Sequence, residues 1–317
     1  MVTEVLVLGG GYTAVWAARR LHREIAEGSQ VRITVVSASQ THAFHGWTAE
    51  VLTGHVRIER TLTRLTDLLP GVRVIAGTVG EVDLERREVV VVGSDRVTRL
   101  PYDYLVLGVG SRDATERVPG LDAHAHSTKG DGALESLVAH LDVVVARAAV
   151  TQDPIERARL LTVLVAGGGF AGVETAVALQ QRLDALVHGR GGIVGIRPRV
   201  VLVHAGSALL PSLRPRFERV ADHAATQVAL TGVEVWCGSR LTAVTATTAL
   251  VAGRPALPVG TVVTTLGQVP VALPGTETLV RDGTGRLVVD RYLRVHDASG
   301  VLDGVWAGGD VAAVPHP

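Results

Sequence analysis

The sequence is poor in cysteine, and this scarcity excludes several kinds of chemistry. Its 317 residues include one cysteine, Cys237. A single thiol forms no internal disulfide and no Cys-x-x-Cys redox pair, and it excludes zinc sites built on several cysteines. The apolar neighbours in "GVEVWCG" predict a buried, inert thiol rather than a nucleophile. We therefore expect a protein of a reducing compartment, the cytoplasm.

The chain also lacks a surplus of either charge and a long apolar run. The 31 Lys and Arg residues balance 31 Asp and Glu residues. A balanced charge argues against a general nucleic-acid binder, because phosphate binding usually needs a basic surplus. The first apolar run has no basic segment before it and breaks at Gly9, which argues against a signal peptide. The apolar segments are too short to span a bilayer, whereas peripheral contact with the inner membrane face stays open.

Two glycine-rich segments repeat one pattern about half the chain apart. The first is "VLVLGGGYTAVWAARRL", from Val5, and the second is "VLVAGGGFAGVETAVAL", from Val163. Each reads as a buried strand, a glycine turn and a helix. The motif positions are Gly9, Gly11 and Ala14 in the first segment, and Gly167, Gly169 and Gly172 in the second.

This pattern is typical of a dinucleotide site. The first glycine allows a tight turn, the second lets a pyrophosphate approach the backbone, and the third position must be small so that helix and strand can pack. The helix N-terminus offers unpaired N–H groups and a positive dipole end to the phosphates. One such turn often serves packing alone, but two copies in the same context predict two dinucleotides. One would be a permanently held FAD, and the other a visiting NADH or NADPH.

The rest of the chain indicates an α/β fold. The strand "VRITVV" follows the first glycine unit and completes the start of a parallel layer. Residues 72–93 alternate without a helical period, which predicts a small antiparallel meander. The segment "YDYLVLGVGS" then reads as another buried strand that ends in glycine. The turn-rich stretch 109–130 predicts a crossing between domains. In "AGGDVAAV", Gly309 and Asp310 stand at a strand end before an expected helix. There Asp310 would accept hydrogen bonds from ribityl hydroxyls, cap the helix, or do both.

In order, the segments "VLVLGGGYTA", "YDYLVLGVGSRD", "VLVAGGGFAGVE", "TVVTTLGQVP" and "GVWAGGDVAAV" resemble the two-dinucleotide flavoprotein reductases. Within that superfamily the chain looks most like the type II NADH:quinone oxidoreductases. The segment "HAFHGWTAEVLTG" is similar to the one those enzymes place beside the flavin, and "GVETAVAL" resembles their stretch after the nicotinamide glycines.

The resemblance implies two Rossmann-like three-layer domains, each with a small antiparallel meander. The FAD domain would comprise 1–110 plus 273–317, with the NAD(P)H domain, 111–272, inserted between them. The resemblance carries over the cofactor contacts Asp310 and Gly309 for the ribityl chain, Gly108 and Val79 for the adenosine half of FAD, and Gly267 in "TVVTTLGQVP". It also implies that Glu174 lies near the nicotinamide; the alternative is an exposed glutamate in the first helical turn, where it favours the dipole.

Two positions depart from the pattern of the fold. An acid that binds a ribose diol is expected at the end of each second strand, and here Ser37 and His204 stand there. Losing such an acceptor weakens adenosine anchoring by about 1–3 kcal/mol per site. At the second site the missing negative charge also admits a 2′-phosphate. We expect NADPH to be accepted at least as well as NADH, with His204, Arg214 or Arg216 near the phosphate, and Ser37 raises the alternative that FAD is weakly held.

A loop after the second strand carries His42, His45 and Trp47. It is either a polar loop with one packed indole, or it lines the flavin or acceptor pocket with a histidine that supplies protons. We take His42 and His45, with Glu174, as the candidate catalytic residues. The two histidines without a third ligand argue against a metal site.

The preferred function is an FAD-dependent oxidoreductase that takes a hydride from NAD(P)H and passes electrons to a quinone-like or other small acceptor. The absence of a cysteine pair excludes a dithiol relay. Two alternatives remain: a nucleotide-binding sensor or partner subunit with weakened redox function, and a reductase component for a protein acceptor. A homodimer stays open.

Overall fold

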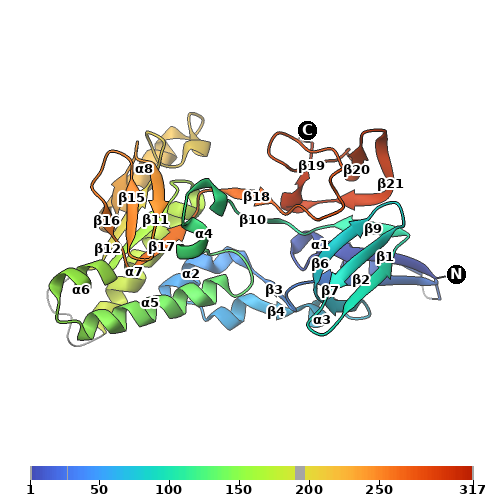
Figure 1. The fold of residues 1–317 in the computed structure, drawn as a ribbon, viewed down its shortest axis with the longest axis horizontal. Helices are drawn as coiled ribbons and strands as arrows, with labels where there is room; N and C mark the ends of the chain where they lie inside the picture. Colours follow the sequence, from blue (N-terminus) through green and yellow to red (C-terminus); the bar gives the residue numbers. More distant parts are fainter. Residues whose placement is uncertain (1, 27, 190–196, 316–317) are drawn as a thin grey trace. The chain divides into compact units, whose positions relative to one another are not determined.

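The computed structural model describes residues 2–26, 28–189 and 197–315 and divides the chain into two compact units (Figure 1). Unit 1 comprises Met1–Phe44, Arg60–Arg112 and Gln268–Pro317, and unit 2 comprises His45–Glu59 and Asp113–Gly267. The N-terminal segment 1–110 is therefore interrupted, contrary to expectation. The physical reason lies in one short helix.

That helix is α2 (Thr48–Thr53), which packs on α7 (Phe170–His188) of unit 2. Its Leu52 is fully buried within the hydrophobic core of unit 2. Burial of one leucine side chain contributes about 2 kcal/mol, enough to fix such a short helix on its neighbour. The loop after the second strand thus ends in a helix that belongs to the other unit.

Within the described residues, unit 1 is built on a sheet of six strands. In sheet order they span Arg294–Asp297 (β20), Gly300–Ala307 (β21), Tyr104–Leu107 (β9), Thr3–Leu8 (β1), Val31–Ser37 (β2) and Arg73–Ala76 (β5). All neighbours pair in parallel except β20, which pairs antiparallel with β21. β9 is thus the buried strand expected from "YDYLVLGVGS", whereas β5 belongs to the main sheet and not to the expected meander.

The two faces of this sheet carry different layers. Along β1 the side chains alternate: Val5 and Val7 pack with the helical layer, and Leu6 and Leu8 pack with a meander on the opposite face. The helical layer contains α1 (Tyr12–Glu24) and α3 (Leu65–Leu68), and the antiparallel meander contains β6 (Thr78–Asp83), β7 (Glu88–Val92) and β8 (Val97–Pro101).

Short strand pairs complete unit 1 and its connections. They are β3 (Thr41–Ala43) with β4 (Leu62–Arg64), β10 (Ser111–Asp113) with β18 (Gln268–Pro270), and β19 (Leu287–Val288) with β22 (Ala312–Ala313). β10 and β18 pair where the chain leaves unit 1 and returns to it.

The described part of unit 2 contains a four-stranded parallel sheet. In sheet order its strands span Glu234–Trp236 (β13), Arg199–Val203 (β12), Thr162–Ala166 (β11) and Thr261–Thr264 (β17). All five residues of β11 are buried. A strand covered on both faces in this way is typical of a parallel sheet between two layers.

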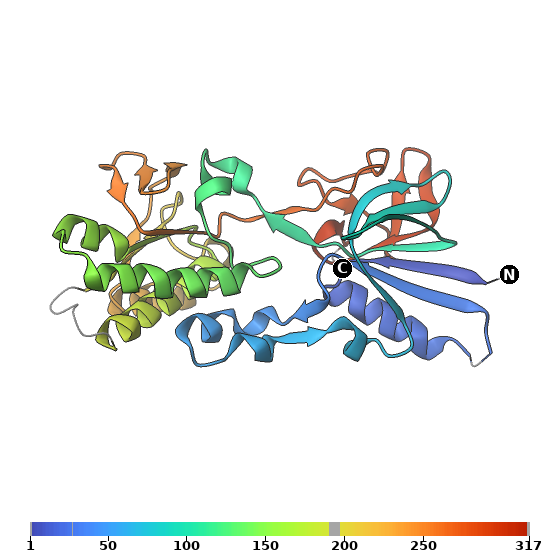
Figure 2. The same cartoon turned by 60° about the horizontal axis from the view of Figure 1, so that its bottom comes forward.

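Helices cover one face of this sheet and a second meander covers the other, as Figure 2 shows for α5 in green and the short strands in orange. The helices with side chains in the core of the first face are α2, α5 (Ala133–Val150), α6 (Pro154–Leu160), α7 and α8 (Glu218–Leu230). The meander consists of β14 (Leu241–Val244), β15 (Thr248–Val251) and β16 (Leu257–Pro258), and α4 (Leu121–His124) lies beside β14. Both units are three-layered α/β domains with a meander, which confirms the expected fold class.

A pair of half-buried histidines lies at the edge of unit 2. The rings of His126 and His140 lie 4.2 Å apart, and His140 Nε2 lies 2.9 Å from Thr261 Oγ1. Burial, and then the neighbouring His140, lower the pKa of His126 to about 4. Burial also lowers the pKa of His140, a shift to which the Arg147 charge adds and which a hydrogen bond to the Gly260 carbonyl opposes. Both rings are therefore held in the neutral form.

The core of unit 2 predicts a contrast between two leucines. Leu179→Ala in α7 removes a fully buried side chain, and we expect the free energy of unfolding to fall by about 2–5 kcal/mol. Leu230→Ala, at the exposed end of α8, is the matched control, because that side chain is 74% exposed. Its effect should stay within about 0.5 kcal/mol. Urea unfolding followed by circular dichroism measures both; equal effects would contradict the core described here.

The histidine pair predicts a loss of stability in acid. As pH falls from the ordinary His pKa of 6.5 towards 4, the unfolded chain takes up a proton that folded His126 does not. The free energy of unfolding is therefore highest above pH 6.5 and falls as acid is added. His126→Gln should flatten this slope, whereas His124→Gln, at an exposed position nearby, should not. Chemical denaturation between pH 4 and 8 gives the slopes; an unchanged slope in the His126 variant would refute the assignment.

Candidate functional site: two glycine cradles

The turn after β1 in unit 1 requires glycine at its first position. Gly9 has φ of +115°, and a Cβ there would lie 2.3 Å from the carbonyl oxygen of Gly108. The end of β9 thus presses directly on the turn that follows β1. Gly11 differs, because a Cβ there would meet nothing within 4 Å. The backbone at Gly11 therefore faces open space at the N-terminus of α1, whose 13 residues start directly after it.

The third position of this motif holds a small residue, as the dinucleotide-binding pattern requires. Ala14 is fully buried, and a Cβ added at Gly108 would lie 3.4 Å from its methyl group and 3.3 Å from its nitrogen. A larger side chain at Ala14 would push α1 away from β9. Gly108 therefore acts as a close-packing position under α1.

Unit 2 repeats this construction. Gly167 has φ of +118°, and a Cβ there would lie 2.4 Å from the carbonyl oxygen of Thr265, directly after β17. At Gly172 a Cβ would lie 1.7 Å from the Gly167 oxygen. At Gly169, the residue that precedes the 19-residue helix α7, a Cβ would meet nothing within 4 Å. The second glycine of each motif is thus the one that faces open space.

The geometry of both turns fits a diphosphate. Free N–H groups at a helix N-terminus and the positive end of the helix dipole attract phosphate oxygens. The space in front of Gly11 and Gly169 is where such oxygens would approach the backbone. We call these two turns the first cradle (Gly9, Gly11 and Ala14) and the second cradle (Gly167, Gly169 and Gly172). At Gly11 and Gly169 neither cradle is filled by a side chain, so the residues present fit the expected cofactors.

The ends of the two second strands have different environments. Ser37 ends β2 and is 6% exposed, and its Oγ lies 2.5 Å from where a Cβ of Gly10 would be. The hydroxyl thus faces the glycine turn. A serine here offers one hydroxyl in place of the two carboxylate oxygens of an acid.

His204 follows β12 and folds back on its own glycine turn. Its Nδ1 accepts a hydrogen bond of 3.2 Å from the Gly168 N–H, so the proton of the neutral ring is on Nε2. Within the described residues Nε2 is buried without a hydrogen-bond partner. Burial lowers the pKa of His204, which keeps the ring neutral.

The two arginines expected near a phosphate have other partners. Arg214 forms ion pairs with Asp222 at 2.6 Å and with Glu218 at 3.4 Å. Arg216 lies over the Phe217 ring.

Residues next to Asp310 in the chain and in space place it beside the first cradle. Gly309, at φ of +75°, brings the backbone so close to α1 that a Cβ would lie 2.6 Å from Thr13 Oγ1. The Ser111 hydroxyl donates to Asp310 Oδ2 at 2.7 Å and lies 2.9 Å from Gln268 Oε1. The expected helix after Asp310 is wrong over the described residues: a 3-10 turn, Gly309–Val311, leads into β22. Asp310 is also not an N-cap, since Gly308 occupies that position.

The two histidines of the loop are divided between the units. His42, in unit 1, has Nδ1 2.9 Å from the Gly10 carbonyl and an edge-to-face contact of 4.7 Å with Tyr12. Since a carbonyl only accepts, Nδ1 carries the proton and Nε2 is the acceptor of the neutral ring. His45 is exposed and belongs to unit 2, with Trp47 in the same 3-10 turn.

Glu174 lies in a groove of unit 2 lined by α2, α7 and α8, together with His55 and His223. It is exposed and is the fifth residue of α7, so its expected place in the first helical turn is wrong. The wall of this groove is largely apolar, with Val173 and Val177 on the same helix. His55 and His223 were missed in the sequence because neither follows a strand or lies in a motif.

The remaining predicted contacts have structural roles as well. Val79 pairs with Val91 in the meander and packs against the core of unit 1. Gly267 has φ of +100° and lies against Arg117, whose Nη1 donates to the Leu266 carbonyl at 2.7 Å. Over residues 2–26, 28–189 and 197–315, no group of three metal-ligating side chains is found. Within the same ranges no helix is long and apolar enough to cross a membrane.

Two variants separate packing from phosphate binding. Gly169→Val places its side chain in open space at φ of −78°, so we expect the fold to persist while NADH and NADPH binding weakens at least about tenfold. Gly172→Ala forces a clash with Gly167 and should lower the free energy of unfolding by more than about 2 kcal/mol. Thermal unfolding and calorimetric titration measure the two effects; strong nucleotide binding by folded Gly169→Val would rule out this cradle.

Comparison with known proteins agrees with this geometry. Residues 3–317 match the pyridine nucleotide-disulphide oxidoreductase family. An NADH dehydrogenase-like protein of Mycobacterium tuberculosis is 32% identical over 324 residues, which cover 98% of this chain and 73% of the relative. A type II NADH:quinone oxidoreductase of the same organism is 33% identical over 254 residues, 76% of this chain and 50% of the relative.

Among solved structures, NDH2 from Plasmodium falciparum in complex with NADH has a TM-score of 0.87 at 17% identity, covering 99% of this chain and 65% of that one. An engineered water-forming NADPH oxidase bound to NADPH has a TM-score of 0.76 at 18% identity, covering 98% of this chain and 63% of that one. The chain thus spans less than two thirds of each of these two solved chains. It belongs to the pyridine nucleotide-disulphide oxidoreductase family and is an FAD-dependent NAD(P)H oxidoreductase.

Proposed function

We propose that this chain oxidises NADH or NADPH and passes the electrons to a small, quinone-like acceptor. The observation that carries the proposal is the pair of glycine cradles, each with open space in front of a long helix. When bound, FAD supplies the two-electron chemistry that links a hydride donor to such an acceptor. The residues of the chain bind, orient and hydrogen-bond the two nucleotides.

Unit 1 is the proposed FAD unit. Gly9, Gly11 and Ala14 form the diphosphate cradle, and Asp310 supplies a carboxylate beside it for a ribityl hydroxyl. Ser111 supports that role, because its hydrogen bond to Oδ2 holds the carboxylate in place. Ser37 supplies a single hydroxyl for the ribose, so the diphosphate and Asp310 carry more of the affinity.

Unit 2 is the proposed NAD(P)H unit. Gly167, Gly169 and Gly172 form its cradle, and Glu174 lies one helical turn further along α7. The groove at Glu174 offers an apolar wall and a carboxylate, which suits a nicotinamide ring and its amide. In unit 1, His42 keeps its proton on Nδ1 and has Nε2 to exchange a proton with an acceptor.

The quinone-like acceptor is supported by the type II NADH:quinone oxidoreductases among the relatives. The chain's single thiol, Cys237, follows β13, and burial raises its pKa. A raised pKa keeps the sulfur protonated, which makes it a poor nucleophile. With one such thiol this chain does not supply a thiol pair of its own, which favours an acceptor outside the chain.

A second candidate function is a nucleotide-binding sensor or partner subunit. The observation in its favour is that neither Ser37 nor His204 supplies the acid that anchors a ribose. Flavin spectra distinguish the two functions. With the flavin-loaded chain under anaerobic conditions, an enzyme bleaches on addition of NADH or NADPH and recovers its colour when a water-soluble benzoquinone is added. Binding without bleaching would favour the sensor, and recovery only with a protein acceptor would reject the small-molecule acceptor.

Asp310→Ala tests the FAD assignment of unit 1. We expect FAD affinity to fall at least about tenfold, because a charge-assisted hydrogen bond contributes about 1.5–3 kcal/mol. Asp303→Ala, in the same unit, is the control, since the Asp303 side chain is 99% exposed. Fluorescence of released flavin after ultrafiltration measures retention. If both variants retain FAD like the parent chain, Asp310 has no part in holding it.

A further inference from the structure

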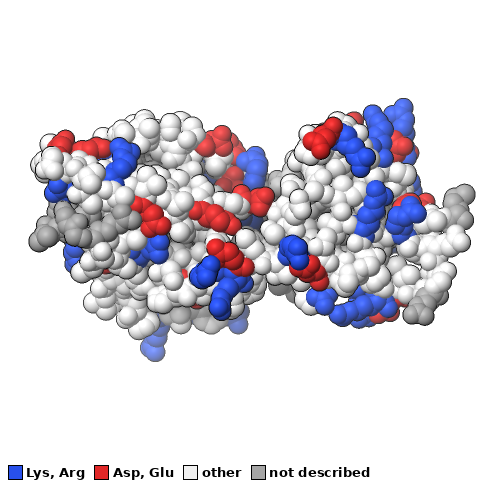
Figure 3. Space-filling model, turned by 90° about the horizontal axis from the view of Figure 1, so that it is seen from below, with Lys and Arg blue, Asp and Glu red and all other residues white. Residues whose placement is uncertain are grey.

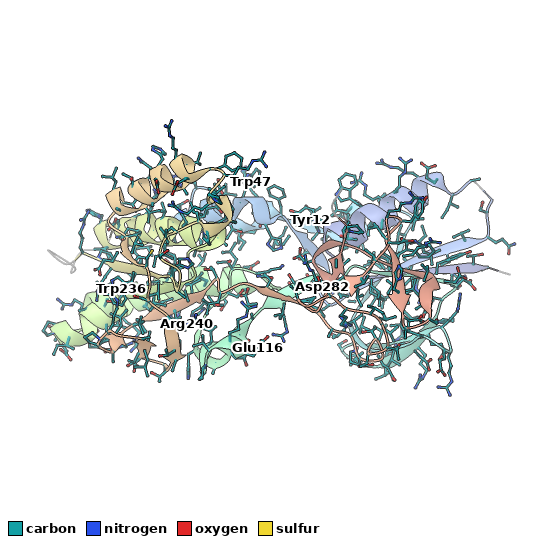
Figure 4. The ribbon with its side chains drawn as sticks, turned by 90° about the horizontal axis from the view of Figure 1, so that it is seen from above. Tyr12, Trp47, Glu116, Trp236, Arg240 and Asp282 are labelled. Atoms are coloured by element: carbon teal, nitrogen blue, oxygen red, sulfur yellow. The ribbon has the colours of Figure 1, made fainter. Side chains whose placement is uncertain are left out.

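A pocket of unit 2 lies where the strands of the parallel sheet end. It is lined in part by Val203 at the end of β12, by Ala205, by Ser239 and Arg240 after β13, and by Leu266 after β17. Arg117 lines it from the chain segment that precedes α4. Trp236 and Arg240, labelled in Figure 4, mark the end of β13 and the start of the following meander.

The pocket is positively charged. Two guanidinium groups line it and no carboxylate does. Across the described ranges, neither Arg117 nor Arg240 forms an ion pair. Other arginines of unit 2 are paired, such as Arg199 with Glu234 at 2.7 Å. Figure 3 shows, on the face it draws, basic and acidic side chains interspersed. Two arginines without an acidic partner at one pocket therefore indicate a site for an anionic ligand.

The two arginines are held differently. Arg117 Nη1 donates to the Leu266 carbonyl, which fixes that guanidinium at the end of β17. Arg240 is exposed, and its backbone carbonyl accepts from the Ala252 N–H, which holds the main chain while the guanidinium stays accessible to solvent. One cation is thus pre-positioned and the second is available to close on a ligand. This arrangement suits an anion with several acceptor oxygens, such as a phosphate.

The pocket lies where a nucleotide on the second cradle presents its ribose. Thr265, which presses on Gly167, directly precedes Leu266 of the pocket, and Val203 directly precedes His204. In this fold the ribose hydroxyls are bound at the end of the second strand, by an acid for NADH or beside an arginine for NADPH. Here no acid stands at that position, and the ring of His204 is turned to Gly168.

We propose that Arg117 and Arg240 bind the 2′-phosphate of NADPH and make NADPH the preferred nucleotide of unit 2. The inference rests on the proposed function, because it needs a nucleotide on the second cradle. The sequence suggested Arg214 as a phosphate ligand, but this side chain forms ion pairs with two acids. The two arginines of the pocket therefore take its place. The proposal also explains why no acid stands at position 204, because a carboxylate there would repel the phosphate.

The test compares two ligands that differ only in the 2′-phosphate. Binding of NADP⁺ and NAD⁺ to the flavin-loaded chain is measured by isothermal titration calorimetry at low and at physiological salt. We expect NADP⁺ to bind at least about tenfold more tightly than NAD⁺, with a ratio that narrows as salt screens the arginines. Arg240→Gln should bring the ratio close to one, chiefly by weakening the binding of NADP⁺. Arg219→Gln, an exposed arginine of α8 outside the pocket, is the matched control and should keep the parent ratio.

The outcomes separate this inference from the function on which it rests. Equal affinities for NAD⁺ and NADP⁺ in the parent chain, or an unchanged ratio in Arg240→Gln, would overturn the phosphate assignment and leave the cradle intact. Failure of both nucleotides to bind would overturn the proposed function together with this inference. Arg117→Lys provides a second check: it keeps the charge but loses the planar fork, and we expect an intermediate ratio.

Discussion

A single close contact shapes each half of this protein. In unit 1 the carbonyl of Gly108 presses on Gly9, and in unit 2 the carbonyl of Thr265 presses on Gly167. Each contact joins the end of a neighbouring parallel strand to the turn between a strand and its helix. Because no side chain fits there, the turn stays tight and the helix starts with its N–H groups towards the sheet edge. The open space at Gly11 and Gly169 follows from this geometry, and so does the capacity to hold a diphosphate.

The same edge of each sheet collects the polar groups that distinguish the two units. In unit 1 the turn Gly309–Val311 brings Asp310 beside the first cradle, where Ser111 holds its carboxylate. In unit 2 the segment before α4 and the loop after β13 bring Arg117 and Arg240 to one pocket that no acid lines. One cradle thus has a negative neighbour and the other a positive one. This difference, rather than the glycines themselves, underlies the role that we propose for each unit.

The two missing acids have separate consequences. Ser37 faces its glycine turn and offers one hydroxyl, which reduces the number of hydrogen bonds to a ribose. His204 accepts from Gly168 and stays neutral, so it stabilises the loop and removes a negative charge from the end of β12. In the assignment proposed above, the serine weakens a contact to FAD, whereas the histidine changes which nucleotide the second site favours. The paired state of Arg214 and the unpaired state of Arg117 and Arg240 support that distinction.

Local pattern by itself determined most strands, the glycine turns and their repetition in two halves of the chain, because periodicity and glycine spacing act over a few residues. It also indicated both cofactors and singled out Ser37 and His204. It placed β9 correctly as a buried strand but misplaced β5 in a meander, since a buried parallel strand and a meander strand have similar compositions. Only the tertiary structure decided that α2 packs in unit 2, that Asp310 is held by Ser111 and that Arg117 meets Arg240 at one pocket. These contacts join residues about 120 to 200 positions apart, and their free energy depends on packing and charge that no local pattern records.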